Sequence, residues 1–193
     1  YPITPVRSLT AAPLGSVSKP QLDVARNLVY LAISYPGQVG HIAAVHLDNG
    51  QVDKVCDIKG SALYFVSSIA YDSATGSLFY TTDNNSWRDL KSVDIRTGDQ
   101  KTLMSDGRVG DLVYSYADSA LWGIRHFNGL TTVVRIPPPY TQWNQIYSWP
   151  YGRDMYGIDI SPDGKFLTAG LSEIDGSQRL IRISLDSLRR GDT

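Results

Sequence analysis

The segment Ile158–Asp159–Ile160–Ser161–Pro162–Asp163–Gly164–Lys165–Phe166–Leu167 joins two short apolar runs through a tight polar turn. Three looser copies of this pattern occur earlier in the chain, at residues 22–30, 68–80 and 112–123. Their second apolar runs begin near Leu28, Leu78 and Leu121, which gives a repeat of about 40–50 residues. A repeat of this length, in which every unit consists of strands, is typical of β-propeller blades.

Alternation of apolar and polar residues predicts an all-β fold of about four four-stranded antiparallel blades. The blades are expected at residues 21–58, 67–103, 111–149 and 156–185. The last blade has no fourth strand in the sequence, which continues instead into a single helical turn at Leu185–Arg190. Turn residues such as Asp48–Asn49–Gly50 support the strand boundaries, because Asn and Gly accept positive φ angles.

The first twenty residues, 1–20, are rich in proline and are predicted to form an extended linker or to supply a closing strand at Val6–Thr10. If Val6–Thr10 completes the last blade, the chain forms a four-bladed ring. Otherwise the chain is a fragment of a larger propeller with about six to eight blades. The fragment is the favoured interpretation, because most propellers have more than four blades and the sequence ends where the next strand is expected to begin. An unclosed stack of blades would leave sheet edges exposed, which is costly.

Composition excludes several classes of protein. The chain has 193 residues, of which 42% are hydrophobic and 19% charged, a balance typical of a globular domain. Its formal net charge of −1 provides no field that would attract nucleic acid. No run of about 18 apolar residues predicts a membrane span. Cys56 is the single cysteine and lies in an alternating strand, which indicates a buried structural thiol.

The turn Ser161–Pro162–Asp163–Gly164, followed by Lys165 and a strand, resembles the repeat signature of TolB-like or WD40-like bacterial β-propellers. Leu130–Tyr140 is similar to the propeller part of larger proteobacterial TolB-like proteins. The resemblance covers residues 22–185, although only one repeat keeps the motif intact and none ends in Trp-Asp. It implies a periplasmic or extracellular location and binding of other macromolecules, and it implies no reaction. The turn itself needs no ligand, because Pro, Asp and Gly each favour tight turns.

Motifs of catalysis are missing from the sequence. It contains no Gly-x-Ser-x-Gly, no phosphate-binding loop, no dinucleotide fingerprint and no His-Glu-x-x-His. His41 and His46 are five residues apart on one predicted strand, so they face opposite sides and cannot hold a metal together. His126 stands at the end of a strand. We therefore expect no catalytic residue, no metal and no cofactor within this chain.

The segment Thr82–Asp89 is the first candidate binding loop, because it joins the two middle strands of the second blade. Asp83, Asn85 and Asp89 are oxygen donors at spacings that loosely suggest calcium, but the central Gly and the bidentate Glu of a calcium loop are missing. The alternatives are a plain polar hairpin and a recognition loop. Trp87 and Arg88 favour recognition, because both residue types are enriched where binding energy concentrates.

Two Gly-Arg corners between blades, at Arg108 and Arg153, form a second candidate. Together with Asp106, Asp111 and Asp154, they either line the mouth of the central channel as an anion site or pair locally and hold neighbouring blades together. The anion site is plausible chemically because the guanidinium fork matches a carboxylate.

Aromatic residues are concentrated at Tyr140, Trp143, Tyr147, Trp149 and Tyr151. They either pack blade against blade or form a platform for carbohydrate, and nucleic acid is disfavoured because basic residues do not alternate with the rings. The sequence thus predicts a non-enzymatic scaffold that binds a protein or peptide partner through its loop-rich face. The alternatives are the non-catalytic propeller of a hydrolase or peptidase, whose catalytic domain lies outside this chain, and a carbohydrate-binding propeller.

Overall fold

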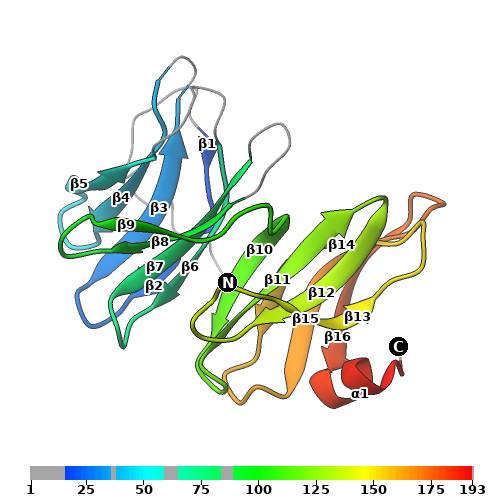
Figure 1. Cartoon of the computed structure of the whole chain (residues 1–193). Helices are drawn as coiled ribbons and strands as arrows, with labels where there is room; N and C mark the ends of the chain where they lie inside the picture. The colour runs from blue at the N-terminus through cyan, green and yellow to red at the C-terminus, as the bar shows by residue number, and fades with distance from the viewer. Residues whose placement is uncertain (1–15, 36–37, 59–64, 84–88, 193) are drawn as a thin grey trace, which may run out of the picture.

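Four antiparallel sheets make up the structure, a computed structural model that describes residues 16–35, 38–58, 65–83 and 89–192 (Figure 1). Blade 1 contains β1 (Ser16–Val17), β2 (Gln21–Asp23), β3 (Leu28–Ser34), β4 (His41–His46) and β5 (Val52–Asp57). Blade 2 contains β6 (Phe65–Asp72), β7 (Ser77–Asp83), β8 (Leu90–Asp94) and β9 (Gln100–Met104). Blade 3 contains β10 (Val109–Ser115), β11 (Ala120–Phe127), β12 (Leu130–Ile136) and β13 (Asn144–Ser148). Blade 4 contains β14 (Asp154–Ile160), β15 (Phe166–Ser172) and β16 (Gln178–Ser184), followed by helix α1 (Leu185–Arg190).

The sheets follow one another as the blades of a propeller, so the all-β propeller predicted from the repeat is confirmed (Figure 1). In blade 1 the inner strand has two halves, β1 and β2, which both pair with β3. Ser18 bridges the break, because its backbone N–H donates to the Ala32 carbonyl and its hydroxyl accepts from the Ala32 N–H, both at 3.0 Å. The expected closing strand Val6–Thr10 lies outside the described residues.

One irregularity recurs in all four inner strands. In blade 3, Gly110 pairs with Ile124 and Val113 with Trp122, so β10 contains one residue more than β11 between the two pairs. The same single insertion occurs in β6, in β14 and across the break between β1 and β2. Such a bulge bends a strand and increases its twist. The repeated insertion therefore bends every inner strand at a corresponding place.

In the part of the chain that the structure describes, the core consists of three apolar clusters, each between two successive blades. Blades 1 and 2 share Tyr30, Ile42, Ile69 and Leu78, blades 2 and 3 share Phe79, Leu90, Leu112 and Leu121, and blades 3 and 4 share Trp122, Ile124, Ile158 and Leu167. Cys56 is buried in the first cluster, in agreement with the structural role predicted for it. Helix α1 forms where a helical turn was predicted, and buries Leu185 and Leu188 in the third cluster.

The hairpins β2–β3, β6–β7, β10–β11 and β14–β15 lie at one end of the propeller, which we call the turn end. Here Asp23, buried in blade 1, accepts hydrogen bonds from the Tyr71 hydroxyl of blade 2 at 2.7 Å and from Arg26 at 2.8 Å. In blade 4 the Ser161 hydroxyl donates to Asp163 at 2.6 Å and accepts from the Phe166 N–H at 3.0 Å. The polar turn residues of the repeat thus hold the scaffold.

Among the described residues, the structure contains no helix with the length and apolar character needed to cross a membrane.

Candidate functional site

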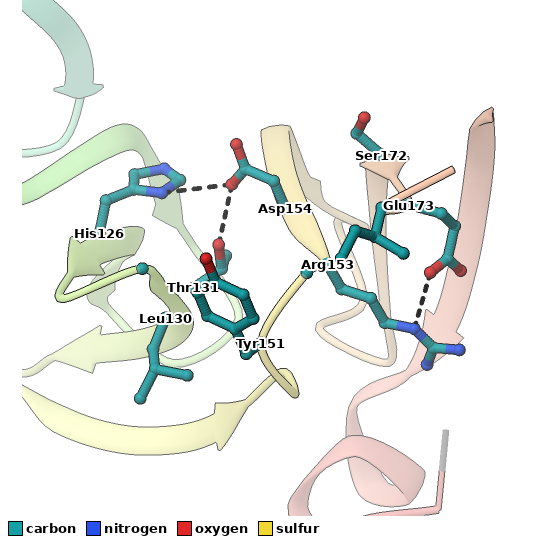
Figure 2. Close-up of a pocket in the computed structure, with 11 residues that line it drawn as sticks. His126, Leu130, Thr131, Tyr151, Arg153, Asp154, Ser172 and Glu173 are labelled. Atoms are coloured by element: carbon teal, nitrogen blue, oxygen red, sulfur yellow. Dashed lines mark hydrogen bonds and ion pairs between the residues drawn. The ribbon is translucent and has the colours of Figure 1, made fainter. Parts of the chain in front are cut away.

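The opposite end of the propeller, which we call the loop end, carries the hairpins β11–β12 and β15–β16 and the connections β9–β10 and β13–β14. A pocket of ≈ 350 Å³ opens here between blades 3 and 4 (Figure 2). Its lining consists of His126, Gly129, Leu130, Thr131, Tyr151, Gly152, Arg153, Asp154, Ser172, Glu173 and Ile174. These residues come from the two hairpins and from the β13–β14 connection, so the pocket exists only because the two blades are adjacent.

One carboxylate organises the blade 3 side of the pocket. Asp154, the first residue of β14, lies with its Oδ1 atom 2.8 Å from the Thr131 hydroxyl, which donates to it, and 3.2 Å from Nδ1 of His126 (Figure 2). The Asp154 side chain is 60% exposed. Among the described residues nothing donates to its Oδ2 atom, so this oxygen remains available as an acceptor.

The blade 4 side of the pocket is an ion-pair network around Glu173, the only glutamate in the sequence. Nε of Arg153 donates to Oε2 of Glu173 at 2.8 Å, and Arg179 donates to Oε1. The Glu173 side chain is only 15% exposed. Arg153 is therefore neutralised by a residue of the β15–β16 hairpin, and it does not pair with the neighbouring Asp154.

Large apolar side chains surround the opening. Tyr151 is 76% exposed and Ile174 is 80% exposed. Each lies against a glycine with positive φ: a Cβ atom on Gly129 would come within 2.8 Å of the Tyr151 ring, and one on Gly152 within 3.1 Å of Ile174. These two glycines are required both by their backbone conformation and by the close packing of the rim.

The other Gly-Arg corner lies at the junction of blades 2 and 3. Nε of Arg108 donates to Oδ1 of Asp106 at 2.6 Å, and the Asp106 N–H donates to Oδ1 of Asp89 at 3.1 Å. The Arg108 guanidinium also lies 5.1 Å from the ring centroid of Phe127, at the end of β11. This corner is thus joined both to the end of the β7–β8 loop and to the β11–β12 hairpin.

The predicted site residues fall into three groups in the structure. Arg153 and Asp154 line the pocket, and Asp89 and Arg108 both contact Asp106 at the blade 2–3 corner. Asp83 ends β7. Asn85, Trp87 and Arg88 lie outside the described residues. Among the described residues no hydrogen bond or ion pair joins the two corners, so they are separate places on the loop end.

The aromatic group is divided between the core and the surface. Tyr140 packs on Phe79 with ring centroids 4.7 Å apart, and Tyr147 meets Trp149 edge to face at 5.0 Å. Trp149 is buried, whereas Tyr151 alone reaches the pocket. Most of these rings therefore pack blade against blade, and a stacking surface for carbohydrate would have to rely on Tyr151.

Sequence reasoning missed Thr131 and Glu173 as pocket residues. Thr131 lies inside an apolar strand, where a threonine carries no signal of function. Glu173 had one available signal, because a single glutamate in a chain rich in aspartate is a compositional exception. In the described part of the chain no three His, Cys, Asp or Glu side chains are placed to hold a metal ion.

These features define a β-propeller with a pocket between two blades at its loop end. No protein-family model matches the chain, and no curated protein matches its sequence. Solved structures do match its fold. TolB from Acinetobacter baumannii matches with a TM-score of 0.63 and 13% identity, over 86% of this chain and 43% of that one. The nidogen/laminin complex matches with a TM-score of 0.70 and 13% identity, over 90% of this chain and 67% of that one.

A third match comes from a study of two prolyl endopeptidases, with a TM-score of 0.63 and 11% identity over 89% of this chain and 28% of that one. This chain therefore spans between 28% and 67% of the length of these three matched chains. At these identities the matches establish the fold, and the resemblance to TolB-like propellers expected from the sequence is confirmed at that level.

Proposed function

We propose that this chain is a non-enzymatic propeller scaffold that binds a protein or peptide partner at its loop end, with the pocket between blades 3 and 4 as the anchor. The apolar rim carries the proposal. Tyr151 and Ile174 expose most of their surface. They line the same pocket as Leu130, which is 42% exposed. Neighbouring exposed apolar side chains around a polar floor are typical of interaction sites, and tyrosine is enriched among residues that dominate binding energy.

The polar floor complements a peptide backbone. A partner that places an apolar side chain on the rim brings its amide N–H groups close to Asp154, whose Oδ2 atom accepts no hydrogen bond from the described residues. Charge-assisted hydrogen bonds to a carboxylate are stronger than those between neutral groups. The Arg153–Glu173 pair fixes the opposite wall, so the pocket needs little rearrangement before binding.

The likenesses support a binding role without identifying the partner. One matched structure is a complex between nidogen and laminin, and another is TolB. The resemblance to TolB-like propellers also supports a periplasmic or extracellular location, which we include in the proposal.

Replacement of Tyr151 tests the anchor. We expect Tyr151→Ala to reduce capture of partner by about tenfold or more, because the loss of a central aromatic contact commonly costs about 2 kcal/mol. The measurement is affinity capture from extracts of the source cells with the 193-residue chain as bait, quantified by mass spectrometry. Leu180→Ala is the matched control, since Leu180 is 87% exposed but does not line this pocket. Equal capture by wild type and Tyr151→Ala would contradict the anchor.

The loop that contains Trp87 and Arg88 remains a second contact proposed from the sequence. We expect the double replacement Trp87→Ala and Arg88→Ala to weaken capture and to leave the unfolding temperature nearly unchanged. Unaltered capture in the same pull-down would remove this loop from the proposal.

A hydrolase propeller is the second candidate, favoured by the likeness to prolyl endopeptidases. In this case the catalytic residues belong to another part of a longer protein. The sequence that flanks this chain in its gene decides the point: a Gly-x-Ser-x-Gly or His-Glu-x-x-His segment there would favour the enzyme.

A further inference from the structure

Arg125 in β11 is placed unlike the other arginines. Its guanidinium lies 4.5 Å from the ring centroid of Phe127 and 4.9 Å from that of Trp143. Its Nε atom is buried and has no hydrogen-bond partner among the residues that the structure describes. A buried donor without a partner is unfavourable, and more so when it carries part of a charge.

Among the described residues no carboxylate forms an ion pair with Arg125. In the described part of the chain, every arginine except Arg125 and Arg182 forms an ion pair with Asp or Glu. Arg182 is exposed to water, whereas Arg125 is half-buried. Asp106, which is close enough to affect Arg125 electrostatically, is already paired with Arg108. Arg125 is thus the one described arginine that is both partly buried and without an acidic partner.

A second guanidinium increases the local positive charge. Arg108 and Arg125 both lie over the Phe127 ring, at 5.1 and 4.5 Å from its centroid. Burial lowers the pKa of Arg125, and the nearby Arg108 lowers it further, against a smaller opposite effect of Asp106. Two guanidinium groups lie beside one carboxylate here, so an anion at the Nη atoms of Arg125 would offset the repulsion between the two positive charges.

We propose that Arg125, with Arg108 beside it, binds a carboxylate group of the protein or peptide partner. The inference rests on the proposed function for the kind of partner, but it concerns a separate place at the junction of blades 2 and 3. The guanidinium edge offers parallel N–H donors to a planar carboxylate, and aromatic rings nearby limit hydration of the pair. The partly exposed Phe127 ring adds an apolar surface beside it, which suits a carboxylate attached to hydrocarbon.

Small carboxylates test the site directly, without the natural partner. The probes are N-acetyl-L-leucine for a terminal carboxylate, N-acetyl-L-glutamic acid α-amide for a side-chain carboxylate, N-acetyl-L-leucinamide as the neutral control, and inorganic phosphate. Binding to the 193-residue chain is measured by NMR titration at low salt. We expect at least one carboxylate to bind more tightly than the neutral amide and than phosphate, and the tighter of the two identifies the source.

Variants of Arg125 give the decisive comparison. We expect Arg125→Gln to weaken carboxylate binding at least tenfold and Arg125→Lys to weaken it less, because lysine keeps the charge and loses the fork. Arg182→Gln should stay within twofold of wild type, since Arg182 lies over a different ring, that of Phe166, at 4.0 Å. If Arg125→Gln does not fold, as judged by near-ultraviolet circular dichroism, Arg125→Lys decides the result by the same criterion of reduced affinity.

Three results would overturn the proposal: unchanged affinity in the folded Arg125 variants, equal binding of the neutral amide, or tighter binding of phosphate than of either carboxylate. Tyr151→Ala separates this inference from the proposed anchor. It should leave carboxylate affinity unchanged, so a failure of Tyr151→Ala to reduce partner capture would count against the pocket alone.

Discussion

The two ends of the propeller place the same type of side chain in opposite surroundings. At the turn end, Asp23 is 1% exposed and its carboxylate is fully engaged by Tyr71 and Arg26. At the loop end, Asp154 is 60% exposed and one of its oxygens accepts nothing from the described residues. A carboxylate that is buried and saturated stabilises a scaffold, whereas one that is exposed and half-used is available to a partner. Burial, more than residue type, distinguishes these two carboxylates.

The contact at the turn end follows from the repeat. Asp23 and Asp72 occupy the same position at the ends of inner strands, and Tyr71 and Tyr114 precede that position in the next blade along. Tyr71 of blade 2 donates to Asp23 of blade 1. Tyr114 of blade 3 lies close to Asp72 of blade 2. Burial is the largest cause that raises the pKa of the Tyr114 hydroxyl, and the nearby Asp72 carboxylate raises it further. Blades 1 and 2 thus each supply an aspartate that a tyrosine of the next blade approaches.

The largest expected effect is that of Asp23→Ala. The replacement leaves the buried Tyr71 hydroxyl without its acceptor and removes the acceptor of the Arg26 backbone N–H, which lies 3.1 Å from Oδ1. We expect the free energy of unfolding to fall by about 2–4 kcal/mol, as is usual when one partner of a buried polar network is removed. Urea denaturation of wild type and variant measures it. A loss below about 0.5 kcal/mol would contradict a structural role for this contact.

Lowering the pH should also remove the stabilisation that the Asp23 carboxylate provides, but gradually rather than all at once. Burial raises the pKa of the Asp23 carboxyl, but the hydrogen bonds from Tyr71 and Arg26 outweigh burial, so the pKa lies below its ordinary value. The carboxylate therefore stabilises the fold fully above the pKa of an unfolded aspartate, about 3.9, and this stabilisation is lost as the pH falls through the lower folded pKa. We expect the stability gap between wild type and Asp23→Asn to be constant from pH 7 to 5 and to shrink below pH 4.

Urea midpoints at successive pH values measure this difference in stability between wild type and Asp23→Asn. Taking the difference cancels the titration of the other aspartates, which both proteins share. A gap that widens toward low pH would mean that the folded pKa of Asp23 is raised, contrary to the hydrogen bonds seen here.

The sequence predicted the blades well because strands and turns are local. Alternation and turn residues such as Ser161–Pro162–Asp163–Gly164 are readable within ten residues, and the repeat assembles them into a propeller. It could not predict the Tyr71–Asp23 contact, which joins residues 48 positions apart. Both residues were visible in aligned copies of the repeat, but their pairing depends on how one blade rotates against the next.

The candidate site was predicted only in part, because a sequence pattern shows local features but not contacts between distant residues. Arg153 and Asp154 were found because a Gly-Arg corner recurs between blades. The true partner of Arg153 is Glu173, from a hairpin of the next blade, and no local pattern connects the two. Arg125 lies in a strand, outside the loops and corners in which the sequence predicts binding. An arginine inside an apolar strand such as Ala120–Phe127 is itself a signal, since charged residues are rarely buried without a partner.

The smallest effect on stability is expected at the loop end. Asp154→Ala removes an acceptor from Thr131 and from His126, but water can replace it because the Asp154 side chain is 60% exposed. We therefore expect the free energy of unfolding to change by no more than about 0.5 kcal/mol, as for most surface replacements. Capture of the partner should fall, because the pocket floor loses its available carboxylate oxygen. If Asp154→Ala destabilised the protein as strongly as Asp23→Ala, exposure would not distinguish the two ends, and the pocket would be part of the scaffold.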